Sequence, residues 1–163
     1  MKQNSSIPND IPLNIREDLV KTLNQQLANL SDLYSQTKQA HWSVTGARFY
    51  SLHLLFDTLA ESFESFIDEV AERITALGGL ALGTARLTAQ HSQLPEYPAG
   101  LFDGDKHLIE LTERYSLAAA KMRMAIDRAD ELEDKDTADL FTDISKVIDK
   151  DLWFLSAHLE KAS

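Results

Sequence analysis

The placement of proline is the feature that most constrains how this chain of 163 residues folds. The four prolines lie in the first dozen residues or in one mid-chain stretch: Pro8, Pro12, Pro95 and Pro98. Because proline breaks a helix interior, residues 13–94 and 99–163 are left as two stretches that helices can occupy. Composition agrees, since 24 Leu and 18 Ala against four Val favour helix over strand.

Apolar side chains recur every three or four residues in four stretches, a pattern typical of helices that bury one face. These stripes run from Val20 to His41, Phe49 to Ile74, Leu108 to Ile126 and Phe141 to Leu159. The second is expected to be one continuous helix ending at Gly78 and Gly79, where a helix C-cap favours glycine. Four helices of about 25 to 30 residues each predict an all-α fold, a four-helix bundle.

The links between these helices set the expected topology. A few residues around Gly46 join the first two helices, which makes them antiparallel neighbours. The link from the second to the third, residues 79–103, is long enough to cross the bundle and to carry a short helix. We expect the third helix to open near Asp103, and the fourth to follow Asp136 or Thr137 as its N-cap. Residues 1–12 are expected to form a flexible leader, and 13–163 a single domain.

Net charge limits the partners of the chain. The formal charge is −10 and the isoelectric point is near 4.8, so its surface repels nucleic acid and anionic lipid and favours cations. The absence of cysteine excludes disulfides, thiolate metal sites and cysteine nucleophiles. No apolar run approaches the roughly 18 residues of a membrane span, and the N-terminus has no secretory pattern. The sequence therefore predicts a cytoplasmic protein without a membrane partner.

Histidines and carboxylates form a second pattern beside the apolar one. His41 occupies a stripe position where leucine would be expected, and alone it favours a hydrogen-bonded core histidine over a ligand. In the second helix, His53 and Asp57 are four residues apart, and so are Asp68 and Glu72. Each pair lies one turn apart on one helix face, where two side chains can reach one cation. Nitrogen and carboxylate oxygen without sulfur suit iron, manganese or zinc.

The spacing between the two pairs points to a second copy of the chain. Asp57 and Asp68 are eleven residues apart, about 16.5 Å along a helix, so one helix cannot bring both pairs to one ion. An antiparallel copy, related by a two-fold axis near Ser62 and Phe63, would place one chain's second pair opposite its mate's first pair, with His41 close by. Such an interface makes two equivalent sites per dimer. The alternative, a solvated stripe of charges, stays open on spacing alone.

The full arrangement H-x11-H-x3-D-x10-D-x3-E is present in this chain. Together with its surroundings it resembles the Dps family of small ferritins (DNA-binding proteins from starved cells). The resemblance rests on residues 38–46, 52–57, 67–74, 76–79, 136–140 and 149–155. The larger ferritins, which use Glu-x-x-His pairs inside one bundle, are excluded because no Glu-x-x-His occurs in the sequence.

The resemblance implies a ferritin-like fold and a hollow dodecamer built from two-fold dimers. It also implies ferroxidase sites that hold two iron ions each between subunits, where Fe²⁺ is oxidised, preferably by hydrogen peroxide, and ferric mineral is stored. The implied metal-binding and catalytic residues are His41, His53 and Asp57 of one chain with Asp68 and Glu72 of its mate. Trp42 matches a tryptophan near the iron, where it would act as a radical sink; a core or interface aromatic is the equal alternative.

Two further expectations concern DNA and iron entry. The first fifteen residues contain one basic side chain, Lys2, so we expect weak or absent DNA binding despite the family name. Asp139 and Asp143 share a helix face and are candidates for a pore that draws in Fe²⁺, with helix-dipole compensation as the alternative for Asp139. Two rival functions remain: a shell that mainly compacts DNA, and a redox-inert bundle in which zinc replaces iron.

Overall fold

Helices make up almost all of the regular structure in the computed structural model, which describes residues 8–160. Residues 1–7, most of the expected leader, lie outside the described residues, as do 161–163. The helical segments within 8–160 are α1 (Leu13–Ser43), α2 (Phe49–Glu61), α3 (Glu64–Ala76), α4 (Ala85–His91), α5 (Gly104–Glu131) and α6 (Lys135–Ala157). Across residues 8–160, none of these helices combines the length and apolarity needed to cross a bilayer.

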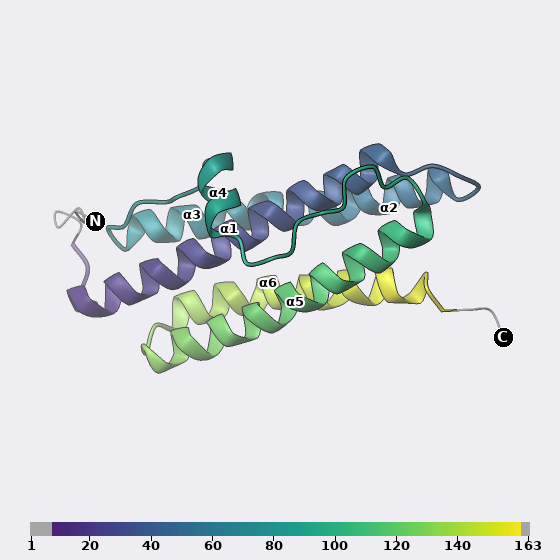
Figure 1. The fold of residues 1–163 in the computed structure, drawn as a ribbon. Coiled ribbons are helices and arrows are strands. Elements are labelled where there is room, and N and C mark those ends of the chain that lie inside the picture. The colour runs from purple at the N-terminus through teal and green to yellow at the C-terminus, as the bar shows by residue number, and fades with distance from the viewer. Residues whose placement is uncertain (1–7, 161–163) are drawn as a thin grey trace.

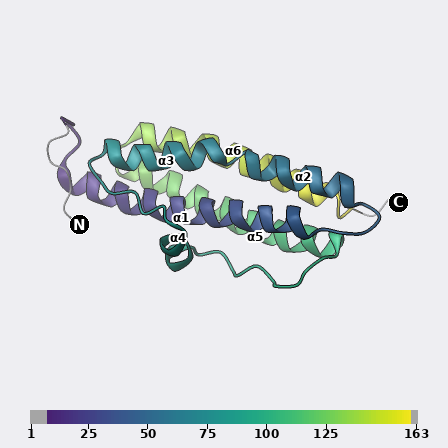
Figure 2. The same ribbon diagram turned by 90° about the horizontal axis from the view of Figure 1, so that it is seen from above.

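The helices form the expected four-helix bundle (Figure 1). One antiparallel pair is α1 with α2 and α3, and the other is α5 with α6. Figure 2 shows α2 and α3 following one another along nearly one line. The connection after α3 carries the predicted short helix α4, which contacts α1, and then runs to the start of α5. The fold class and the short helix are therefore confirmed.

The core is centred on α1, which contacts α2, α3, α4 and α5. One face of α1 is almost completely buried along its length: Leu19, Leu23, Leu27, Leu30 and Leu33. Large aromatic side chains from the other helices fill the space opposite, with Phe56, Phe63, Tyr115 and Phe141 fully buried. Burial of each such side chain contributes roughly 1.5–3 kcal/mol to stability. The apolar stripes read from the sequence thus form the common core.

The expected second helix is interrupted at Ser62 and Phe63, so the prediction of one continuous helix is wrong at that point. The Ser62 hydroxyl donates to the Leu59 carbonyl at 2.7 Å, and the Phe63 amide bonds to Ala60 instead, at 3.0 Å. A serine side chain that takes a carbonyl from the backbone ladder bends a helix locally. The periodicity of the apolar residues continues through this bend, which is why the sequence did not show it.

The end of α3 follows the expected glycine signal. Gly78 has a φ of +84°, which glycine adopts without steric cost. The Gly79 amide donates to Ile74 at 2.9 Å and the Gly78 amide donates to Thr75 at 2.9 Å, so the last carbonyls are satisfied in a Schellman arrangement. A side chain at Gly79 would lie 2.6 Å from Val20, so a small residue is also required there.

The third helix opens as expected and the fourth does not. The Asp103 carboxylate caps α5 by accepting from the Lys106 amide at 3.0 Å. The α6 helix begins at Lys135, with Asp134 at the N-cap position, before the Asp136 or Thr137 that the sequence predicted. The reason is tertiary, because Asp134 is buried and its carboxylate is engaged by another helix.

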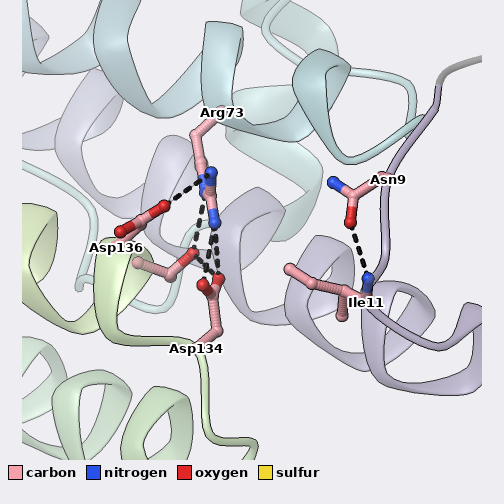
Figure 3. A network of polar contacts seen from close by, with 6 residues as sticks. Asn9, Ile11, Arg73, Asp134 and Asp136 are labelled. Carbon is pink, nitrogen blue, oxygen red and sulfur yellow. Dashed lines mark hydrogen bonds and ion pairs between the residues drawn. The ribbon is translucent and has the colours of Figure 1, made fainter.

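Arg73 of α3 holds that buried carboxylate (Figure 3). Its guanidinium donates to both Asp134 oxygens, each at 2.8 Å, and to the Thr137 hydroxyl at 3.1 Å. The Thr137 hydroxyl also donates to Asp134, and Asp136 lies 3.7 Å from Arg73. Hydrogen bonds between a charged arginine and a carboxylate are stronger than neutral ones. This pair fastens the end of α3 to the start of α6.

Candidate metal centre

A tight turn brings the last turn of α1 beside the start of α2. Val44 leaves the helix in an extended conformation, and the Thr45 amide donates to the Phe102 carbonyl at 2.9 Å. Gly46 then adopts a φ of +98°, and its carbonyl accepts from the Phe49 amide as α2 begins. The turn folds the chain back on itself and fixes which α1 and α2 side chains face one another.

His41 and His53 meet across this turn. Their rings stack with centroids 3.8 Å apart, and each Nδ1 lies 2.8 Å from the backbone carbonyl of the other residue. A carbonyl only accepts, so both Nδ1 atoms carry the proton and both Nε2 atoms are left with a lone pair while the rings are neutral. A histidine fixed in this way by a second hydrogen bond is typical of metal ligands.

Asp57 completes one half of the site. It lies one turn beyond His53 on α2, and its Oδ1 is 3.7 Å from the Nε2 of His41. Its side chain is 32% exposed, whereas that of His41 is 11% exposed, so the carboxylate forms the open side of the group. The His41 Nε2 and the Asp57 carboxylate therefore face one another at the surface beside the stacked His53 ring, and imidazole nitrogen and carboxylate oxygen are donor types that divalent transition metals bind.

Lys38 supplies the cation that neutralises the carboxylate in this group. Its ammonium donates to the Asp57 Oδ1 at 2.5 Å. This hydrogen bond, with help from the nearby histidines, lowers the pKa of Asp57, and the same bond raises the pKa of Lys38. The sequence analysis missed Lys38. The available signal was its spacing of three residues before His41, which places both on one face of α1.

Asp68 and Glu72 lie apart from this group, on α3 beyond the break at Ser62. Both are exposed and lie one turn apart on the helix. Within residues 8–160, no group of three or more His, Cys, Asp or Glu side chains is arranged to hold one metal ion. The chain thus presents two separate sets of ligands, and their meeting through a second copy stays a prediction.

Trp42 and the acidic pair on α6 are both at the surface. Trp42 is 68% exposed, so it does not belong to the core of the chain, and the interface and radical-sink roles remain untested. Asp139 and Asp143 are exposed on α6, and Asp143 accepts from Lys146 at 2.8 Å, which raises the pKa of that lysine. Their role in a pore stays a prediction.

The bundle and its histidine–carboxylate face define the class of protein. A four-helix bundle with one long crossover connection is the architecture of ferritin-like proteins. A ferritin-like domain model matches residues 20–163. This chain belongs to the Dps family of ferritin-like proteins.

Similarity to individual proteins supports that assignment. The chain is 41% identical over 155 residues to the DNA protection during starvation protein of Agrobacterium fabrum, covering 95% of this chain and 96% of that one. DpsC from Streptomyces coelicolor superposes with a TM-score of 0.93 at 32% identity, covering 98% and 93% of the two chains. Dps from Vibrio cholerae, described as a member of a superfamily of ferritin-like diiron-carboxylate proteins, gives 0.88 at 26% identity, with coverage of 96% and 99%.

The Lys38–Asp57 pair predicts competition between lysine and metal. In Lys38→Met the carboxylate no longer has an internal counter-cation, so a divalent ion binds without displacing one. We expect the dissociation constant for Zn²⁺, used as a redox-inert probe, to fall by about ten-fold in isothermal titration calorimetry. The control is Lys21→Met, which removes an exposed lysine paired with Asp18. Equal Zn²⁺ affinity in wild type and Lys38→Met would contradict the competition.

Proposed function

We propose that this protein is a ferroxidase and iron store that oxidises Fe²⁺ with hydrogen peroxide and protects against oxidative stress. Membership of the family supports a role in iron storage or DNA protection in general terms. The observation that carries the narrower proposal is the reciprocal bonding of His41 and His53, which leaves each Nε2 with its lone pair and holds the His41 Nε2 beside the Asp57 carboxylate. With Nδ1 fixed to a carbonyl, Nε2 is the nitrogen of each ring that can bind a metal ion.

The proposed centre lies between two chains. The half-site on α1 and α2 supplies His41, His53 and Asp57, and the exposed α3 of a second copy supplies Asp68 and Glu72. The exposure of this second pair supports the arrangement, because both carboxylates are accessible to a partner. An antiparallel dimer then contains two equivalent sites. We propose that such dimers build a hollow dodecamer that stores ferric mineral.

The chemistry places Fe²⁺ as substrate. Two Fe²⁺ ions each give one electron to one hydrogen peroxide molecule, its O–O bond breaks, and two protons are taken up to form two molecules of water. Negative carboxylates from both chains favour the more highly charged Fe³⁺, while neutral imidazoles fix the position of each ion. The two-electron reduction forms no hydroxyl radical. Trp42, adjacent in sequence to His41, is proposed to give up one electron when a peroxide molecule reacts with one Fe²⁺ ion instead of two.

Substitution of one ligand from the second set tests the proposed centre. In Asp68→Asn the amide cannot replace an anionic oxygen between two cations, so we expect peroxide-driven Fe²⁺ oxidation to slow by about a hundred-fold or more. The measurement is anaerobic loading with Fe²⁺, a peroxide jump, and stopped-flow ferric absorbance. Light scattering must show that the assembly is intact. The matched control is Glu69→Gln, which changes the adjacent exposed carboxylate and should leave the rate unchanged.

The same experiment separates the rival functions. A redox-inert bundle that holds zinc gives no ferric absorbance in wild type after the peroxide jump. A protein that only compacts DNA gives oxidation no faster than Fe²⁺ in buffer. Equal rates for wild type and Asp68→Asn, both well above buffer, would locate oxidation elsewhere in the molecule and contradict the proposed centre.

Acidic residues at the start of α6 provide the proposed path for Fe²⁺. We expect Asp139→Asn with Asp143→Asn to slow iron uptake by about ten-fold at low ionic strength and by less at high salt, because field focusing is screened. Uptake kinetics at two salt concentrations measure this effect. A control with the same change in charge is Glu113→Gln with Asp127→Asn on α5, where both residues are exposed. An iron-uptake rate equal to that of this control would contradict the proposed role of Asp139 and Asp143 in a pore.

DNA binding is expected to be weak or absent at physiological salt. The net charge is −10 and the N-terminal fifteen residues contain only Lys2 as a cation. Several lysines or arginines acting together are needed to displace counterions from duplex DNA. An electrophoretic mobility shift at low salt measures this directly, and tight, saturable retardation of duplex DNA would refute the expectation and favour the DNA-compacting function.

A further inference from the structure

A buried carboxylate lies beside the break between α2 and α3. Asp151, on α6, is 4% exposed, and its Oδ2 lies 2.9 Å from the Ser62 hydroxyl. Neither residue belongs to the proposed set of metal ligands. Burial of a carboxyl group without a cationic partner is costly, so its presence in the interior calls for a physical explanation. The explanation begins with the protons that these side chains hold.

Counting protons shows which form of Asp151 fits the structure. The Ser62 hydroxyl has one proton, yet its oxygen lies 2.7 Å from the Leu59 carbonyl and 2.9 Å from the Asp151 carboxyl. A carbonyl only accepts, and an ionised carboxylate also only accepts. One proton can be shared between two acceptors, but each contact is a full two-centre hydrogen bond only if Ser62 donates to Leu59 and a protonated Asp151 donates to Ser62. The protonated carboxyl group is therefore the form that satisfies both short contacts.

The surroundings of Asp151 favour the neutral form. Tyr115 from α5 is the titratable group that faces it, and burial raises the pKa of that tyrosine, so it carries no charge at neutral pH. The Tyr115 hydroxyl is 3.2 Å from Thr37 of α1, which itself donates to Leu33. The contact with Ser62 and the exposed Lys150 on α6 lower the pKa of Asp151, but they only partly offset the burial. The result is that burial raises the pKa of Asp151 to about 6.

We propose that Asp151 is a positioning residue for the metal centre, and that its protonated carboxyl group, acting through Ser62, holds the break that orients α3 relative to α2. This inference rests on the proposed ferroxidase function, because the break separates the two sets of ligands that the centre needs. His53 and Asp57 precede the break and Asp68 and Glu72 follow it. A change in the bend therefore changes the angle between the two sets.

Ionisation of Asp151 releases the break. The Ser62 proton then turns to the carboxylate, and the Leu59 carbonyl loses its side-chain donor. That carbonyl is the acceptor that the Phe63 amide would use in a continuous helix, in place of Ala60. The local structure can straighten, and α3 then presents its carboxylates in a different direction. The proposed centre is thus complete in the protonated form and misaligned in the ionised form.

Metal-free protein tests the protonation state. The variant Asp151→Asn keeps a neutral donor toward Ser62 at every pH, and the difference infrared spectrum against wild type should show a protonated carboxyl band that titrates near pH 6. Because the folded protein retains a proton that the unfolded chain loses, the wild type is destabilised relative to Asp151→Asn as the pH rises from about 4 to about 6. The difference in melting temperature between Asp151→Asn and wild type should then stay constant at higher pH. A gap independent of pH, or a carboxylate band below pH 5, would overturn the proposal.

Oxidation kinetics test the positioning role. Under anaerobic conditions with a peroxide jump, Asp151→Asn and wild type should oxidise Fe²⁺ at rates within about two-fold at pH 5, and Asp151→Asn should be about five-fold faster at pH 7. Ser62→Ala removes the hydroxyl through which Asp151 acts on the break, so this variant should oxidise Fe²⁺ slowly at both pH values. Asp127→Asn, an exposed carboxylate on α5, is the control and should follow wild type. A ratio of Asp151→Asn to wild type that is equal at both pH values would contradict the proposal.

The two measurements distinguish the possible failures. If wild type does not oxidise Fe²⁺ above the buffer rate, the proposed function fails, while the infrared and melting data still decide whether Asp151 holds the break. If wild type oxidises Fe²⁺ and the melting gap varies with pH, but the rate ratio does not, Asp151 affects stability alone and the positioning role is refuted.

Discussion

The burial of one face of α1 is the constraint on which the rest of the structure depends. This helix contacts both α2 and α3 on one side and α5 on the other, and its leucines from Leu19 to Leu33 are buried. The apolar stripes of α2, α3 and α5 are buried against this helix and that of α6 is buried against α5, because no stripe can be buried within its own helix. The positions of the polar residues follow, since each is carried on a helix whose rotation the core has fixed.

Polar contacts then adjust the ends and bends of these helices. Arg73 fastens α3 to α6 through a buried carboxylate, and Ser62 interrupts the second helix where Asp151 approaches it. The turn at Gly46 sets His41 against His53 and leaves each ring with one free nitrogen. These polar contacts bury less apolar surface in the core than the leucines do. Their effect is to fix the directions in which side chains point, and a catalytic metal centre requires ligands that point in defined directions.

The structure shows where the carboxylates that give the net charge of −10 lie. Some carboxylates, such as Asp149 with Arg123, are paired with cations on the surface, where such contacts contribute little to stability. Asp134 and Asp151 are buried, one held by arginine and one favoured in its neutral form. Asp68 and Glu72 remain exposed on α3. Net charge predicted a preference for cations, yet it could not separate these three kinds of carboxylate.

The sequence by itself determined the bundle, the short helix in the long connection, and the proximity of His41 to His53, because periodicity and glycine placement act over neighbouring residues. Only the tertiary structure decided the break at Ser62, the start of α6 at Lys135, and the contacts of Lys38 and Asp151. Each of these depends on a partner distant in sequence or on another helix: Lys38 on Asp57, Asp134 on Arg73, and Ser62 on Asp151. Local patterns record which face a residue occupies, whereas a hydrogen-bond partner across the bundle is fixed only once the helices have packed.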